Sequence, residues 1–120
     1  MFDLNAVEPD NTDVNDLEEI VMGLIINAGQ ARSLAYAALK EAKQGKFIVA
    51  KEMMENSRQA LSEAHRVQTQ LIESDAGEGK VKVSLVLVHA QDHLMNAMLA
   101  RELITEMIEL YENMNSFTLD

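Results

Sequence analysis

The chain has 120 residues, a length that fits one domain with a modest hydrophobic core. Its formal net charge of −10 would repel nucleic acid and anionic membrane surfaces. The absence of cysteine excludes disulfides and thiolate chemistry, and no apolar run approaches the roughly 20 residues of a membrane span. The acidic N-terminus does not resemble a signal peptide. These features predict a soluble cytoplasmic protein that does not insert into the membrane.

Residues 1–14 are predicted to form a flexible acidic tail. A first helix is predicted from Asn15, because Asn15 stands three residues before Glu18, as in a capping box. Lys43 suits the last turn of this helix and Gly45 its C-terminal cap. The apolar residues that recur at steps of three and four are Leu17, Val21, Leu24, Ala28, Ala31, Ala35, Ala38 and Leu39.

A second helix is predicted from Phe47 to Glu73. Its apolar stripe has a polar step between Met54 and Leu61. The stripe consists of Phe47, Ala50, Met54, Leu61, Ala64, Gln68 and Leu71. The glycine-bearing segment that follows, residues 74–80, lacks the spacing of a phosphate-binding loop and is predicted to be a flexible turn.

The third element, from Val83 to Asn113, begins with "VKVSLVLV", whose valines and alternation favour a strand. The chain offers no second strand to pair with it, and the residues that follow have a strongly helical pattern. We therefore predict one long helix. Three helices with short connections predict an all-α, antiparallel up-down three-helix bundle over residues 15–115, followed by a tail at 116–120.

The third helix is apolar around its whole circumference, a pattern typical of a helix that is buried on every side. Three helices cannot bury one member completely, so another copy of the chain must cover it, and we expect an oligomer. The apolar residues are Leu85, Val86, Leu87, Val88, Leu94, Met95, Ala97, Met98 and Leu99.

Polar residues interrupt this apolar helix at His89, Asp92, His93 and Asn96, a spacing that places them on one face. Three interpretations stay open. The polar groups can set the register of a core, the two histidines and the carboxylate can bind a metal, or a histidine can act as a nucleophile. A zinc hydrolase is disfavoured because Ala90 stands where the HExxH motif has glutamate.

The third histidine and the two tyrosines of the chain are predicted to have structural roles only. His65 on the second helix is predicted to lie at the surface or at a groove edge. Tyr36 and Tyr111 are predicted to pack with their hydroxyl groups in water.

The block "VLVHAQDHLM", with "LITEMIELY" after it, resembles the enzyme IIA component of the lactose/cellobiose class of the bacterial phosphoenolpyruvate:sugar phosphotransferase system. "NAGQARSLAYAALKEAKQG", "EAHRVQTQLI" and the "GEG" turn are also similar, so the resemblance covers residues 17–112. Ala90 and the preceding "SLVLV" favour the N,N'-diacetylchitobiose or cellobiose branch, which transports β-linked disaccharides.

This resemblance implies a homotrimer in which His89 accepts a phosphoryl group from the phosphocarrier protein HPr and passes it to a cysteine of enzyme IIB. We expect Nε2 of His89 to react, because it reaches further from the helix. The resemblance also implies that the three copies of Asp92 meet on the trimer axis and hold one Mg²⁺ ion. Gln91 and His93 match the motif, and packing or supporting hydrogen bonds are expected of both. The rival hypothesis is a non-catalytic helical trimer that serves as a scaffold with a structural metal.

Overall fold

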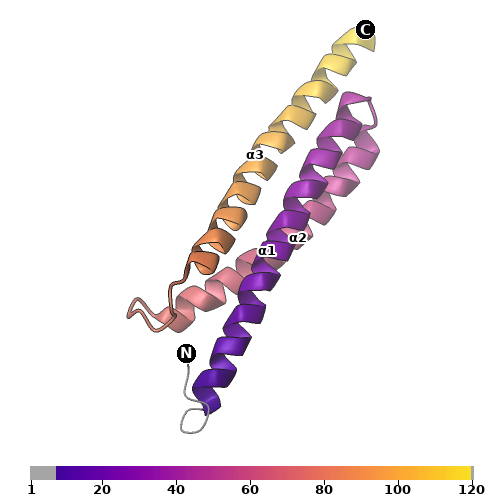
Figure 1. Ribbon diagram of the computed structural model, residues 1–120. Coiled ribbons are helices and arrows are strands. Elements are labelled where there is room, and N and C mark those ends of the chain that lie inside the picture. Colours follow the sequence, from indigo (N-terminus) through magenta and orange to yellow (C-terminus); the bar gives the residue numbers. More distant parts are fainter. Residues whose placement is uncertain (1–7, 120) are drawn as a thin grey trace.

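The computed structural model describes residues 8–119. It contains three helices, α1 (Glu8–Lys43), α2 (Phe47–Asp75) and α3 (Leu85–Leu119). They run up, down and up in an elongated bundle, with α1 packed against both other helices (Figure 1). The predicted all-α three-helix bundle is therefore confirmed. Within the described residues, no helix is long and apolar enough to cross a membrane.

Helix α1 begins earlier than the sequence pattern indicated. It starts at Glu8, so Asn15 lies inside the helix and is not its cap. Pro9 fits the first turn, where its missing N–H would have no helical partner. Between residues 10 and 22 there is no glycine or proline to end the helix. Residues 1–7 of the predicted tail lie outside the described residues.

The predicted end of α1 is confirmed. Gly45 has φ +82°, a left-handed conformation that glycine adopts at little cost. The N–H of Lys46 donates to the carbonyl of Glu41 at 3.0 Å, and the N–H of Gly45 donates to the carbonyl of Ala42 at 2.9 Å. This pair of bonds is a Schellman motif, and it turns the chain directly into α2.

Small residues along α1 form the centre of the core. Leu24 is the largest side chain on this helix that is completely buried, and the alanines repeat along the same face. These buried alanines are Ala28, Ala31, Ala35, Ala38 and Ala42. The polar step of α2 also lies in the core, because Ser57 is completely buried and its Oγ donates a hydrogen bond to the carbonyl of Ala31 at 2.6 Å.

Helix α3 begins after Ser84, whose Oγ accepts a hydrogen bond from the N–H of Leu87 at 3.2 Å. The valine-rich segment is therefore helical from Leu85 onward, two residues later than the predicted start at Val83. The helix extends beyond the predicted Asn113 to Leu119, so residues 116–119 of the predicted tail are helical, and Asp120 lies outside the described residues.

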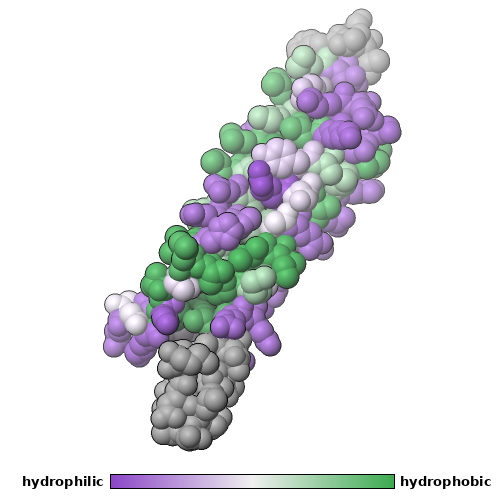
Figure 2. Space-filling view, in the orientation of Figure 1, coloured by the Kyte–Doolittle hydropathy of each residue, from purple (hydrophilic) through white to green (hydrophobic). Residues whose placement is uncertain are grey.

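Helix α3 is apolar on its outer side as well as on its inner side, as predicted. Its inner face is buried against α1, whereas large apolar side chains on its outer face remain exposed. Figure 2 shows apolar groups gathered on the visible face of the bundle, most densely in its lower half. The exposed residues of α3 are Leu85, Val86, Val88, Met95, Leu99, Leu103, Met107, Leu110 and Met114.

The left-handed conformation of Gly45 can be tested by substitution. Gly45→Val should lower the free energy of unfolding by about 1–2 kcal/mol, because a β-branched residue is strained at positive φ. Gly45→Asn should lose less, because asparagine tolerates this conformation. Urea denaturation monitored by circular dichroism measures both values. Equal stabilities of the two variants would contradict this account of the turn.

Candidate functional site

His89, Asp92, His93 and Asn96 line one groove of about 520 Å³ between α1 and α3. The structure therefore brings together the polar residues that the spacing placed on one face. Leu99, Ala100 and Leu103 continue the wall along α3, and α1 supplies Arg32 and Tyr36 from the other side. The groove combines an apolar wall with a few convergent polar groups, an arrangement typical of binding sites.

The two histidines of α3 contact each other directly. Nε2 of His89 lies 3.1 Å from Nε2 of His93, and the ring planes meet at 87°. In such a contact one nitrogen donates its proton and the other accepts with its lone pair. If His93 donates, the proton of His89 is on Nδ1, and the Nε2 lone pair of His89 is the nucleophilic one. His89 is exposed, so a reacting group can approach it.

The backbone beneath His89 is held in place by the buried side of the same helix. Ala90, Leu94 and Ala97 are all at most 1% exposed and belong to the core cluster that includes Leu24 and Ala28 of α1. The backbone of His89 is therefore fixed, and only rotation of the side chain can change the position of its imidazole.

Gln91 connects the site to the third helix of the bundle. Its Nε2 donates a hydrogen bond to Oε1 of Gln68 on α2, at 2.6 Å. The side chain therefore points away from the groove and fixes α3 against α2, two residues before His93. This placement agrees with the packing contact that was expected of Gln91.

Arg32 and Tyr36 also line this groove, a position that the sequence pattern did not predict. The guanidinium carbon of Arg32 lies 5.4 Å from the centre of the Tyr36 ring, a cation–π contact within α1. Tyr36 is half exposed, in agreement with the wetted hydroxyl that was predicted. The four-residue spacing of Arg32 and Tyr36 predicts that the two side chains lie on one face of a helix, but it does not reveal which other helix that face meets.

Asp92 lies where this groove meets a second, more apolar hollow of about 530 Å³. Leu85, Val86 and Val88 line that hollow together with His89 and Asp92. Among the side chains of residues 16–116, no three histidine or acidic groups of one chain gather closely enough to hold a metal ion. A carboxylate is nevertheless a ligand that suits Mg²⁺, and identical copies of Asp92 can supply the others.

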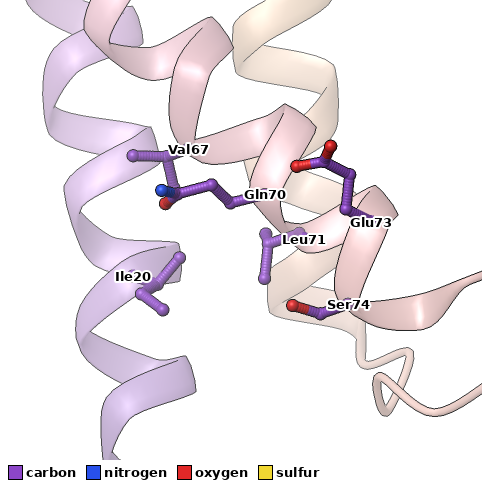
Figure 3. Close-up of a pocket in the computed structure, with 6 residues that line it drawn as sticks. All are labelled: Ile20, Val67, Gln70, Leu71, Glu73 and Ser74. Carbon is purple, nitrogen blue, oxygen red and sulfur yellow. The ribbon is translucent and has the colours of Figure 1, made fainter.

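Two further hollows contain no histidine. The hollow in Figure 3 lies between α1 and the end of α2, where Gln70 reaches toward Ile20 and Glu73 points away. The groove between α2 and α3 contains Arg101, which donates to the carbonyl of Met54 at 3.3 Å. Burial, reinforced by the nearby Arg58, lowers the pKa of Arg101. Its polar groups hold α2 to α3, as does the ion pair of Lys51 and Glu112 at 2.8 Å.

His65 is exposed on α2 and does not line the groove of His89. This position agrees with the surface role that the sequence predicted. Tyr111 is half-buried on α3, consistent with a packing residue.

Comparison with known proteins gives matches over nearly the whole chain. The family described as "PTS system, Lactose/Cellobiose specific IIA subunit" matches residues 19–112. The N,N'-diacetylchitobiose-specific EIIA component of Escherichia coli K12 is 70% identical over 116 residues, which cover 97% of this chain and 100% of the relative.

Two solved structures have the same architecture. The E. coli IIA(Chitobiose) chain, in a solution structure of its complex with HPr, is 77% identical with a TM-score of 0.73, covering 82% of this chain and 96% of that one. A crystal structure of the cellobiose-specific enzyme IIA from Bacillus anthracis is 48% identical with a TM-score of 0.79, covering 82% and 91%. The chain therefore belongs to the lactose/cellobiose-specific IIA subunits of the sugar phosphotransferase system.

Proposed function

We propose that His89 is the residue through which this chain relays its phosphoryl group, from HPr to the cysteine of a cognate enzyme IIB. The chain is a phosphotransferase component of a sugar phosphotransferase system and does not itself handle the sugar. The exposed Nε2 of His89, in contact with His93 at the mouth of the groove, is the observation that supports this residue. Its similarity to the E. coli relative supports N,N'-diacetylchitobiose as the sugar that the complete system transports.

The transfer steps follow from the geometry of the two imidazoles. The lone pair on Nε2 of His89 attacks the phosphorus of phospho-HPr, so a new N–P bond forms while the donor's N–P bond breaks. The donor imidazole leaves with the electron pair. The N–H of His93, released from that lone pair, then lies beside the phosphoryl oxygens. In the second step the thiolate of enzyme IIB attacks the phosphorus, an S–P bond forms, and Nε2 regains its lone pair.

Positioning makes the largest contribution to such a reaction, because phosphoryl transfer passes through a loose, in-line transition state. The core residues beneath His89 hold its backbone in place, and the open side of the groove leaves a direct approach to Nε2.

The assignment of His89 predicts the outcome of a phosphorylation assay with phosphoenolpyruvate, enzyme I and HPr. The native chain should gain one acid-labile, base-stable phosphoryl group, whereas His89→Gln should gain none and keep its helicity. His65→Gln, an exposed histidine outside the groove, should be labelled like the native chain, and His93→Gln should keep at least part of the labelling. Mass spectrometry measures the phosphoryl content of each variant.

The same assay separates the competing functions. A scaffold or a hydrolase would remain unmodified when all donors are present. Labelling that survives in His89→Gln would show that another residue is the acceptor.

We also propose that the chain works as a homotrimer assembled through α3. Support comes from the exposed apolar side chains of this helix, which recur at steps of three or four residues and continue past the site on both sides. We call this row the α3 seam. It consists of the apolar residues Leu85, Val88, Met95, Leu99, Leu103, Met107, Leu110 and Met114, together with Asp92, which occupies one position of the same row.

Sedimentation equilibrium at micromolar concentration should therefore give three times the chain mass of 13.4 kDa. Leu99→Glu should reduce the mass toward that of one chain, because it buries a charge in the α3 seam. Ile48→Glu is the matched control: Ile48 is 78% exposed on α2, outside the seam, and its replacement should leave the mass unchanged. A native chain that sediments as a monomer would contradict the proposed assembly.

The role proposed for Asp92 follows from its place in the α3 seam. In a trimer its three copies would approach the axis, where carboxylates in poorly solvated surroundings repel one another. A hard divalent cation such as Mg²⁺ would relieve this repulsion through the carboxylate oxygens, with one ion per trimer. The ion would stabilise the assembly and would leave the transfer chemistry to His89.

Melting curves with EDTA and with Mg²⁺ test this role. The native chain should melt at a higher temperature with Mg²⁺, whereas Asp92→Leu should keep the trimer, melt higher than the native chain in EDTA and respond to neither addition. Glu52→Leu removes an exposed carboxylate from α2 and should keep the Mg²⁺ response. An Asp92→Leu variant that becomes monomeric, or that folds but accepts no phosphoryl group, would show that Asp92 acts differently.

A further inference from the structure

A phosphoryl group on His89 would enter a groove that already contains negative charge. The group itself has a charge of about −1.5 to −2 near neutral pH. Asp92, one helical turn along α3, lines the same groove, and the whole chain has a net charge of −10. Like charges at this range disfavour each other. A cation in the groove would therefore favour the phosphorylated state.

Arg32 is in the right place to be this cation. Among the described residues that line the groove, it is the only lysine or arginine. Its helix, α1, forms the wall opposite the histidines of α3. The guanidinium takes part in no salt bridge with the side chains of residues 16–116, and its own side chain is exposed. Its N–H groups are therefore available to an anion that arrives in the groove.

Tyr36 restricts where the guanidinium can lie. The guanidinium carbon of Arg32 lies over the Tyr36 ring, 5.4 Å from its centre, so the ring attracts the cation through its charge. This attraction does not require a hydrogen bond from an N–H donor, and the donors of Arg32 can face an incoming anion. Both residues line the groove of His89, one turn apart on α1.

We infer that Arg32 binds the phosphoryl oxygens of phosphorylated His89 through its N–H groups, with Tyr36 as the residue that positions it. This inference rests on the proposed function. An arginine can hold two phosphoryl oxygens at once, a geometry that a lysine lacks. The N–P bond forms and breaks at Nε2 of His89 as described above, and Arg32 gives up no proton and no electrons.

The position of the phosphorylation equilibrium with phospho-HPr tests this role. Arg32→Gln should lower the equilibrium constant for phosphorylation about tenfold, the size expected when a charge-assisted contact is lost. Arg32→Lys should lie between this variant and the native chain. Arg66→Gln is the matched control, because Arg66 is an exposed arginine of α2 paired with Glu63 at 2.6 Å, outside the groove. It should behave like the native chain.

Chemical rescue separates binding of the phosphoryl group from a structural effect. Methylguanidinium added to Arg32→Ala should raise the phosphorylated fraction, whereas methylammonium at the same concentration should raise it less, because it cannot present two parallel N–H donors. Tyr36→Phe keeps the ring face and should match the native chain. Tyr36→Leu removes the aromatic ring and should lower the equilibrium constant for phosphorylation, though by less than Arg32→Gln does.

The results distinguish failure of this inference from failure of the proposed function. If Arg32→Gln matches the native equilibrium while His89 is still labelled, Arg32 does not bind the phosphoryl group and the relay through His89 stands. If His89→Gln is labelled, the relay itself is assigned to the wrong residue. If Arg32→Gln loses helicity, Arg32→Lys is the deciding variant. The inference would be overturned if Arg32→Lys had the native equilibrium constant and if methylguanidinium and methylammonium rescued Arg32→Ala equally.

Discussion

Close packing along the alanine face of α1 is the contact on which the rest of the bundle depends. An alanine adds only a methyl group to the backbone, so the axes of α2 and α3 can lie near that of α1. At this short distance the hydroxyl of Ser57 on α2 donates a hydrogen bond to the carbonyl of Ala31 on α1. The same closeness brings the side chains at the edge of α1 beside those of α3, and the groove of His89 is formed there.

The site and the α3 seam share one helix, and this sharing explains why α3 has three kinds of face. Leu94 and its buried neighbours point to α1, the histidines point into the groove, and Met95 and Met107 belong to the outer side. Asp92 stands at the boundary between the groove and the seam. The proposed phosphoryl transfer and the proposed assembly would thus use neighbouring faces of one helix, with no separate domain for either.

Most of the fold and half of the groove follow from local patterns. Periodic apolar residues locate the helices, and the spacing of His89, Asp92 and His93 places them on one face because helix geometry is fixed. The start of α1 at Glu8 was missed, because a good cap at Asn15 permits a helix to begin but does not prevent it from beginning earlier. Arg32 was missed because its partnership with α3 depends on how two helices pack, which no local pattern encodes.

The outer face of α3 also determines how the protein responds to oxidants. The chain has no cysteine to react first, and Met95 and Met107 are 59% and 43% exposed along the seam. Oxidation converts a thioether into a sulfoxide, which adds a polar oxygen to an otherwise flexible apolar side chain. A sulfoxide at Met95 would lie one turn from Asp92 and weaken apolar contacts there without touching His89. In dissociated chains, where these side chains are exposed, methionine oxidation would thus disfavour the proposed assembly, and a methionine sulfoxide reductase could reverse it.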